Sequence, residues 1–233
     1  MPGPLDPDAF DVLTFDCYGT LIDWERGLLT ALRAQLGDAV AAVGDDALLE
    51  AFAAVEHEAE SPYQPYRAVL EQALGDLGSR FGVAPDDAGR TAFAASVPDW
   101  PAFADSHEAL VRLQSRYRLV PITNCDDDLF AGSAARLGVT FDDVVTAQQA
   151  GAYKPDERPF LLAFDRVGVP RERILHVAQS LWHDHVTAQA LGLTSVWINR
   201  RAGRPGGGAT PPAQAAPDLE LPDLRSLADL LVG

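Results

Sequence analysis

Apolar residues in this chain occur in two spacings that alternate along most of its length. Five short runs, several rich in β-branched side chains, predict buried strands at 12–16, 119–123, 143–146, 174–178 and 194–198. Between the later runs, Leu, Val and Phe recur every three or four residues, which is the spacing of an amphipathic helix. Because strands and helices alternate in this way, we predict an α/β fold with a doubly wound parallel sheet.

The stretch between the first two predicted strands is different, since it contains no convincing strand pattern. Its apolar residues instead predict four helices, around 28–36, 48–55, 69–77 and 86–96. A block of helices between two strands of one sheet indicates an inserted subdomain. We therefore expect a core domain of residues 1–23 and 99–233 and a helical domain of residues 24–98.

The last part of the chain contains a long segment rich in Gly, Pro and Ala, at 201–217, which predicts a mobile loop. Apolar residues then predict a closing helix at 221–231. We find no internal repeat in the sequence.

Reactive and polar side chains follow the predicted strands. Asp16 ends the first strand, and Gly19 then permits a tight turn before the hydroxyl of Thr20. Thr123 and Asn124 close the second strand. Ligands of open α/β sheets bind outside the carboxyl ends of the strands, so these side chains are expected to share one site. Taken singly, each could equally cap its own strand end.

Two more charged residues join this set. Lys154 is the only lysine among the 233 residues, which favours a role at the site over a solvated surface position. Asp184 follows a later strand end, where the alternative is an ordinary helix N-cap. His183 and His185 flank it, but no further ligand stands at a matching spacing, so we predict no metal site.

The order of these residues resembles the four motifs of the haloacid dehalogenase superfamily. The first motif, Asp16-Cys17-Tyr18-Gly19-Thr20-Leu21, resembles that of the 2-haloacid dehalogenase (type II) branch in particular. The resemblance covers the whole chain and is weakest over about 24–98. It implies a Rossmann-like core, with the helical insertion as a cap over the active site. It also implies a hydrolase that cleaves the carbon–halogen bond of a short 2-haloacid without a cofactor.

The resemblance assigns the catalytic roles. Asp16 is expected to be the nucleophile and to form an aspartyl ester with the substrate, which water then hydrolyses. Lys154 offsets the negative charge, and Asp184 orients Lys154 and activates water. Tyr18 stands where phosphatases of the superfamily usually carry a second Asp that acts as acid and base. A phenol of pKa about 10 is a poor substitute for that carboxylate, and a halide leaving group needs no proton.

The remaining expected site residues face the substrate. Thr20, Thr123 and Asn124 would hold the nucleophile or the substrate carboxylate by hydrogen bonds. Ser180 would shape the loop beside them. Trp182 is expected either to line a halide pocket or to be a core aromatic residue.

Several positions depart from the dehalogenase pattern. Those enzymes carry an early cap Arg that helps to bind the halide, and 47–55 contains none, so we expect Arg67, or else Arg26, to take this role. Phe160 replaces an expected Tyr, and Gln179 stands where a motif-four Asp is common. Two alternatives therefore stay open: a magnesium-dependent phosphatase of the same superfamily, and a non-catalytic binding protein.

Composition and net charge limit the kinds of molecule that we expect the protein to bind. The 18 Lys and Arg against 34 Asp and Glu give a net charge of −16, which argues against nucleic acids and anionic membranes. Cys17 and Cys125 are too few for a disulfide framework, so we expect a reduced, cytoplasmic setting. No signal peptide and no membrane-spanning run is evident. The expected partner is a small haloacid, and a homodimer is compatible with the sequence.

Overall fold

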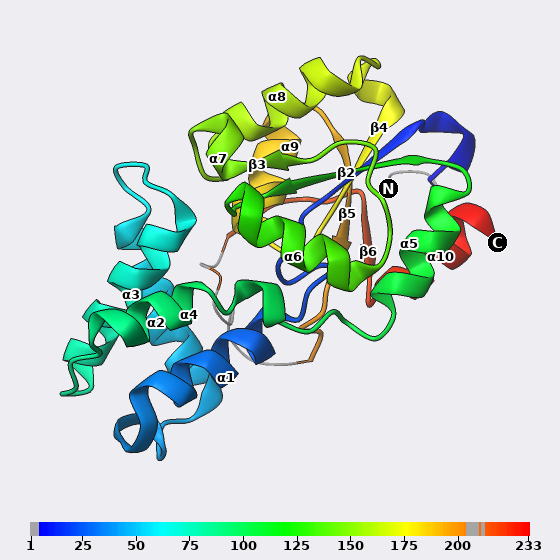
Figure 1. The fold of residues 1–233 in the computed structure, drawn as a ribbon. Helices are drawn as coiled ribbons and strands as arrows, with labels where there is room; N and C mark the ends of the chain where they lie inside the picture. Colours follow the sequence, from blue (N-terminus) through cyan, green and yellow to red (C-terminus); the bar gives the residue numbers. More distant parts are fainter. Residues whose placement is uncertain (1–4, 204–209, 211–212) are drawn as a thin grey trace.

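A computed structural model describes residues 5–203, 210 and 213–233 of the chain (Figure 1). Within them, six parallel strands form one sheet in the order β3-β2-β1-β4-β5-β6. The strands are β1 (Val12–Phe15), β2 (Arg118–Thr123), β3 (Val145–Thr146), β4 (Ile174–Ala178), β5 (Thr194–Ile198) and β6 (Leu219–Leu221). The predicted α/β class with a parallel, doubly wound sheet is confirmed.

The five predicted strands are all present, and a sixth was not predicted. Leu219–Leu221 pairs with β5 and forms the edge strand β6. The closing helix therefore begins later than predicted, at Leu224, where Asp223 caps it by accepting a hydrogen bond from the Ser226 N–H at 2.8 Å. Part of the loop predicted at 201–217 lies outside the described residues.

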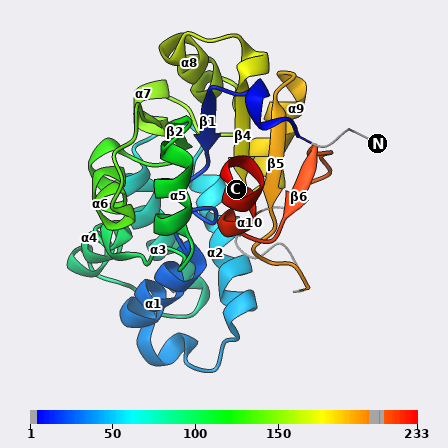
Figure 2. The same cartoon turned by 90° about the vertical axis from the view of Figure 1, so that its right-hand side faces the viewer.

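Two hydrophobic layers cover the two faces of the sheet, because successive strand residues point to opposite sides. In β4, Leu175 and Val177 belong to one apolar cluster and Ile174 to the other. The first cluster includes residues of α5 (Ser106–Gln114), α6 (Asp127–Leu137) and α10 (Leu224–Val232). The second includes residues of α8 (Arg158–Val167) and α9 (Val186–Ala190), and the short helix α7 (Ala147–Ala150) precedes α8. Figure 2 shows α5 and α10 in front of the strands.

The segment between β1 and β2 folds into a separate group of helices beside the sheet (Figure 1). They are α1 (Trp24–Leu36), α2 (Asp45–Ala59), α3 (Tyr66–Arg80) and α4 (Asp87–Ala94), here called the cap helices. Phe52 of α2 and Phe93 of α4 are fully buried and meet edge to face, with ring centroids 6.2 Å apart. The helical periodicity predicts such a buried face, and the buried residues of these helices belong to the same apolar cluster as Leu13 and Phe15 of β1.

Close packing and hydrogen bonds, two of which are described here, tie the cap helices to the core. Gly27 of α1 lies so close to Trp100 that a Cβ atom at this position would fall 2.3 Å from the indole, so a larger residue would push the helix away. Asp126, in the core, accepts hydrogen bonds from the backbone N–H groups of Tyr66 and Arg67, each at 2.9 Å. A core carboxylate thus caps the first turn of α3.

Among the described helices, none combines the length and apolar character needed to cross a bilayer.

Candidate active site

The sheet topology brings the candidate residues together. β1 lies between β2 and β4, and the chain passes through β2 and β3 on one side before it crosses to β4 on the other. The carboxyl ends of β1, β2 and β4 therefore border one crevice, at the point where ligands of such sheets bind. Asp16, Thr123 and Ser180 follow or end these strands.

Asp16 is held at this point by two donors. Lys154 Nζ lies 2.9 Å from Oδ1, and the Thr20 hydroxyl donates to Oδ2 at 2.7 Å. The side chain is nearly buried, at 6% exposure. Burial raises the pKa of Asp16, the Lys154 ammonium opposes this, and the neighbouring charge of Asp184 adds to the increase. A fixed carboxylate of this kind can attack an electrophile at the crevice.

The turn after Asp16 depends on glycine. Gly19 has φ +96°, which side chains on L-residues disfavour, and a Cβ there would lie 3.1 Å from both Gln179 Oε1 and Trp24 Nε1. The turn folds the Thr20 hydroxyl back to Asp16, and the same oxygen accepts a hydrogen bond from the Gln179 N–H at 2.9 Å. Thr20 thus joins the ends of β1 and β4.

Lys154 lies at the centre of the site with all three of its N–H donors used. It donates to Asp16 Oδ1 at 2.9 Å, to Asp184 Oδ1 at 2.7 Å and to the carbonyl of Ile122 at 2.7 Å. Its side chain is 1% exposed. Burial alone would lower the pKa of Lys154, but the two carboxylates outweigh it and raise the pKa. The lysine is therefore a fixed cation between two acids.

The two residues that end and follow β2 take different places. Asn124 holds the backbone of Lys154: its Oδ1 accepts from the Lys154 N–H at 2.8 Å, and its Nδ2 donates to the Lys154 carbonyl at 3.1 Å. The Thr123 hydroxyl is buried, and no described residue bonds to it. A buried hydroxyl without a protein partner is available to a ligand or a water molecule.

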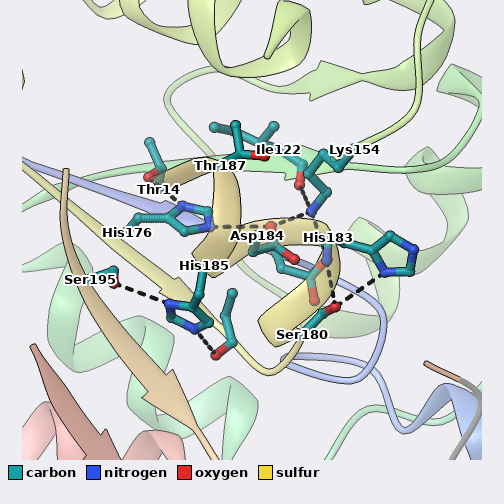
Figure 3. A network of polar contacts seen from close by, with 12 residues as sticks. Thr14, Ile122, Lys154, His176, Ser180, His183, Asp184, His185, Thr187 and Ser195 are labelled. Carbon is teal, nitrogen blue, oxygen red and sulfur yellow. Dashed lines mark hydrogen bonds and ion pairs between the residues drawn. The ribbon is translucent and has the colours of Figure 1, made fainter. Parts of the chain in front are cut away.

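The buried side chain of His176 makes a hydrogen bond to Asp184, which in turn binds Lys154 (Figure 3). His176 Nε2 lies 3.2 Å from Asp184 Oδ1, and His176 Nδ1 lies 2.9 Å from the Thr14 hydroxyl. Because a carboxylate only accepts, Nε2 carries the proton and the Thr14 hydroxyl donates to Nδ1. Burial would raise the pKa of Asp184, but Lys154 and His176 hold it well below its usual range. Asp184 is thus a permanently ionised anchor for Lys154.

A small cavity of about 40 Å³ opens in front of Asp16. Among the described residues its walls are formed by Asp16, Tyr18, Trp24, Glu56, Glu60, Tyr66, Asn124, Lys154, Ser180, His183 and Thr210. Lys154 is the only Lys or Arg among these lining residues. The cavity therefore lies between the strand ends and the cap helices, as a substrate site requires.

The cap side of this cavity carries two carboxyl groups that our sequence reasoning missed. Glu56 and Glu60 lie one helical turn apart at the end of α2, and the Tyr66 hydroxyl donates to Glu56 Oε1 at 2.7 Å. Burial raises the pKa of Glu56 to about 7, and burial together with Glu56 raises that of Glu60 to about 9. Their spacing places both on one helix face, which was the available signal.

Three other predicted site residues are placed as follows. The Tyr18 ring lines the cavity, but its hydroxyl lies 2.9 Å from Ser133 Oγ, and burial raises its pKa well above the usual value. The Ser180 hydroxyl accepts from the His183 N–H at 2.9 Å. Trp182 does not line the cavity, and its buried Nε1 has no partner among the described residues.

The two arginines proposed for halide binding do not reach the cavity. Arg67 projects from the start of α3 and pairs with Asp128 at 2.6 Å. Arg26 is exposed on α1 and is absent from the lining residues. The structure thus does not place Arg67 where the hypothesis needs it, because the first turn of α3 directs this side chain along the outside of the core helix α6.

The two histidines that flank Asp184 contact different groups. His183 lies beside Ser180, whereas His185 lies 3.1 Å from the Ser195 hydroxyl and 3.0 Å from the Ala178 carbonyl. Across the described part of the chain, no three His, Cys, Asp or Glu residues are grouped closely enough to hold a metal ion.

Comparison with known proteins agrees with this geometry. The model of the haloacid dehalogenase-like hydrolase family matches residues 10–192. The chain belongs to this family. The match includes Asp16, Lys154 and Asp184, so the three charged centres of the site all lie within the family region.

Individual relatives of this family differ in activity. The chain is 28% identical to an (S)-2-haloacid dehalogenase of Pseudomonas fluorescens over 145 residues, which are 60% of this chain and 63% of the relative. It thus matches less than two thirds of that relative's length. It is 31% identical over 173 residues to a 5-amino-6-(5-phospho-D-ribitylamino)uracil phosphatase of Escherichia coli, covering 70% of this chain and 67% of the relative.

A solved structure of an L-2-haloacid dehalogenase superposes with a TM-score of 0.79. It is 26% identical to this chain and covers 95% of this chain and 99% of its own. The haloacid dehalogenase-like fold therefore extends through the cap helices, where the sequence resemblance is weakest.

Proposed function

We propose that this family member is a hydrolytic dehalogenase that acts on short 2-haloacids through an ester of Asp16. One carboxylate oxygen of Asp16 attacks the carbon that bears the halogen. The new C–O bond forms as the carbon–halogen bond breaks, and the halide leaves with the electron pair. Water then attacks Cγ of the ester, which restores Asp16 and releases the 2-hydroxyacid.

The main support for this proposal is the environment of Tyr18, which stands two positions after the nucleophile Asp16. The Tyr18 hydroxyl is directed to Ser133 and its pKa is raised, so this side chain has no proton to give or take at the cavity. A phosphate ester needs a proton on its leaving alkoxide, whereas a halide leaves as a stable anion. The arrangement around Asp16 therefore suits a leaving group that needs no acid.

The charges of the cavity are compatible with an anionic substrate at neutral pH. Lys154 offsets the approach of a second carboxylate to Asp16. Glu60, whose pKa is raised to about 9, keeps its proton and adds no negative charge.

Halide release is the direct test. Fluoro-, chloro- and bromoacetate and both enantiomers of 2-chloropropionate should be assayed with wild-type protein and Asp16→Asn in parallel. We expect wild-type protein alone to release halide and the 2-hydroxyacid in equal amounts. No halide from any of these compounds would exclude the assignment.

A magnesium-dependent phosphatase is the second candidate, because the E. coli relative described above is a phosphatase. The residues present fit magnesium poorly. Gln179 contributes a neutral amide where a carboxylate would be needed, and Asp184 Oδ1 already binds Lys154 and His176.

Removal of metal separates the two candidates. We expect full haloacid turnover in excess chelator, and no more than trace hydrolysis of p-nitrophenyl phosphate with magnesium present. Strong phosphatase activity that chelator abolishes would replace the dehalogenase assignment and leave Asp16 as the nucleophile.

A further inference from the structure

The two oxygens of the Asp16 carboxylate are held in different ways. Lys154 binds Oδ1 and is itself fixed by Asp184 and by the Ile122 carbonyl. The Thr20 hydroxyl binds Oδ2 at 2.7 Å, but Thr20 lies in the turn after β1, beyond the paired residues of that strand. The orientation of Oδ2 therefore depends on what holds this turn in place.

Donors from the core hold two successive carbonyl groups of this turn. Arg200 Nη2 donates to the Thr20 carbonyl at 2.9 Å. The Leu21 carbonyl accepts from the Ser106 hydroxyl at 2.7 Å and from the Phe103 N–H at 3.1 Å. Arg200 thus binds the backbone of the same residue whose hydroxyl faces Asp16.

Arg200 comes from a distant part of the sheet. It follows β5, which lies on the other side of β4 from β1 (Figure 2). Neighbouring strands are about 4.8 Å apart, so the reach from β5 across β4 to the turn needs a long side chain. Arg200 therefore joins the end of β5 to the turn that carries Thr20.

Asp105 and an aromatic ring fix the direction of the Arg200 guanidinium. Nη1 lies 2.9 Å from Asp105 Oδ1 and 3.0 Å from Oδ2. The Phe103 ring covers the guanidinium, with its centroid 4.1 Å from Cζ. Asp105 Oδ2 also accepts the Leu224 N–H at 2.8 Å, at the start of α10. The guanidinium is therefore held both along one edge and on one face.

The burial of this pair points to a role other than stability. The side chains of Arg200 and Asp105 are only 10% and 12% exposed. Loss of hydration offsets much of the attraction between such charges, so the pair is weak evidence for added stability. A planar guanidinium instead offers several donors in one rigid arrangement, which the ammonium of lysine does not. The pair thus gives the donor to the Thr20 carbonyl a fixed direction.

We propose that Arg200 is a positioning residue for the nucleophile, because it holds the Thr20 backbone where the Thr20 hydroxyl can orient Asp16 Oδ2 for attack. This role rests on Asp16 being the nucleophile of the proposed function, but it does not depend on the leaving group. Arg200 is absent from the residues that line the cavity in front of Asp16, so it acts through Thr20 and not on the substrate.

The first test measures ester formation in Arg200→Lys, with 2-bromopropionate as the probe. Lysine keeps the positive charge but cannot bind Asp105 and the Thr20 carbonyl in one rigid fork. We expect the rate constant of the first-turnover bromide burst to fall at least about tenfold, because small displacements of a reacting group are costly. The substrate concentration that gives a half-maximal burst should stay within about twofold of wild type.

A double-mutant cycle separates positioning from a structural effect. Thr20→Val removes the hydroxyl that Arg200 is proposed to position. Adding Arg200→Lys to Thr20→Val should therefore slow the burst by less than about threefold more, whereas independent effects would multiply.

The pH profile of the burst gives a second measure of the same contact. Burial raises the pKa of Asp16, and the Thr20 hydrogen bond is among the contacts that lower it. Loss of that bond should raise the pKa further, and Asp16 must be ionised to attack. Both Thr20→Val and Arg200→Lys should therefore move the acid limb of the burst rate to higher pH.

Two further variants complete the test. Asp105→Asn loosens the guanidinium from its other side and should also slow the burst, so the proposal can be tested even if Arg200→Lys is unstable. Arg112→Lys is the matched control, because Arg112 pairs with Asp229 at 2.7 Å and does not line the cavity. It should show the wild-type burst.

Each adverse outcome has a distinct meaning. A wild-type burst rate in a folded Arg200→Lys or Asp105→Asn variant, or losses that multiply in the double variant, overturns the positioning role and leaves the dehalogenase proposal standing. Wild-type protein that releases no bromide rejects the proposed function. The same comparison with p-nitrophenyl phosphate and magnesium then decides the role of Arg200, and inactivity on both substrates overturns it.

Discussion

The two walls of the cavity hold their ionisable groups in opposite ways. On the core wall, Asp16 and Lys154 form an ion pair, and Asp184, buried behind this wall, shares the same cation. On the cap wall, Glu56 and Glu60 face the cavity, and burial raises the pKa of both, with Glu56 adding to the increase at Glu60. The core wall carries an ion pair, whereas on the cap wall Glu60 keeps its proton at neutral pH and Glu56, with a pKa of about 7, titrates there.

The two walls also differ in how rigidly they hold their ionisable groups. Strand ends are rigid and hold the nucleophile in one geometry, because each strand end is bonded to its neighbours on the sheet. The two acids of the cap wall lie at the end of one helix and change their charge between about pH 7 and pH 9. The core wall should therefore govern whether reaction occurs, and the cap wall should govern which substrate enters and at what pH.

Removal of the nucleophile should have the largest effect. Asp16→Asn keeps the size of the side chain but not its nucleophilicity, so we expect turnover to fall at least about 1000-fold while the circular dichroism spectrum stays native. In wild-type protein, a single turnover in heavy-oxygen water should label Asp16. Label found only in the product would mean that water attacks the substrate directly.

Replacement of Lys154 tests whether this cation and the two acids that share it, here called the ion triad, stabilise the fold together. Lys154→Met leaves two buried acids without their partner, so we expect unfolding in urea to require about 3–5 kcal/mol less than in wild type. Lys154→Met combined with Asp184→Asn should recover part of this loss. A change below about 1 kcal/mol would show that the triad is not a unit of stability.

The sign of the pH effect on the triad follows from Asp184. Its folded pKa lies below the unfolded value of about 3.9, so its contribution to stability is present above that pH and is lost as the pH falls further. The stability difference between wild type and Lys154→Met should therefore be smaller at about pH 3 than at pH 7.

The pH dependence of stability that arises from Glu60, on the cap wall, should have the opposite sign. Folding raises the pKa of Glu60 from 4.5 to about 9, so the folded state keeps a proton that the unfolded state releases, and stability falls as the pH rises through this window. Glu60→Gln should therefore raise the melting temperature at pH 8 more than at pH 5. Glu58→Gln, exposed on the same helix, should shift neither value.

We expect the smallest effect on activity from replacement of Arg67, which does not line the cavity. Arg67 pairs with the exposed Asp128, and such surface pairs contribute about 0–1 kcal/mol. Arg67→Ala should therefore change kcat/KM for 2-bromopropionate by less than about fivefold. A larger loss would mean that the cap helices move and bring Arg67 to the substrate during turnover.

Much of the core could be predicted from sequence, because its signals are local. Each strand run carries its own periodicity, and Asp16, Thr20 and Lys154 stand beside strand or helix ends that can be recognised without any partner. β6 was missed because a three-residue strand has too few positions to show a period, and it exists only through its pairing with β5.

The α/β class, the order of the elements and the polar residues that follow the strands could all be predicted from the amino-acid pattern. Which of these residues meet depends on how the elements pack against one another. The pairing of Arg67 with Asp128 joins residues of two helices far apart in the chain. The contact of His176 with Asp184 and the place of Glu56 at the cavity depend on how each element is oriented in the fold. Periodicity reports which face of an element is buried, but not which residue of another element lies opposite it.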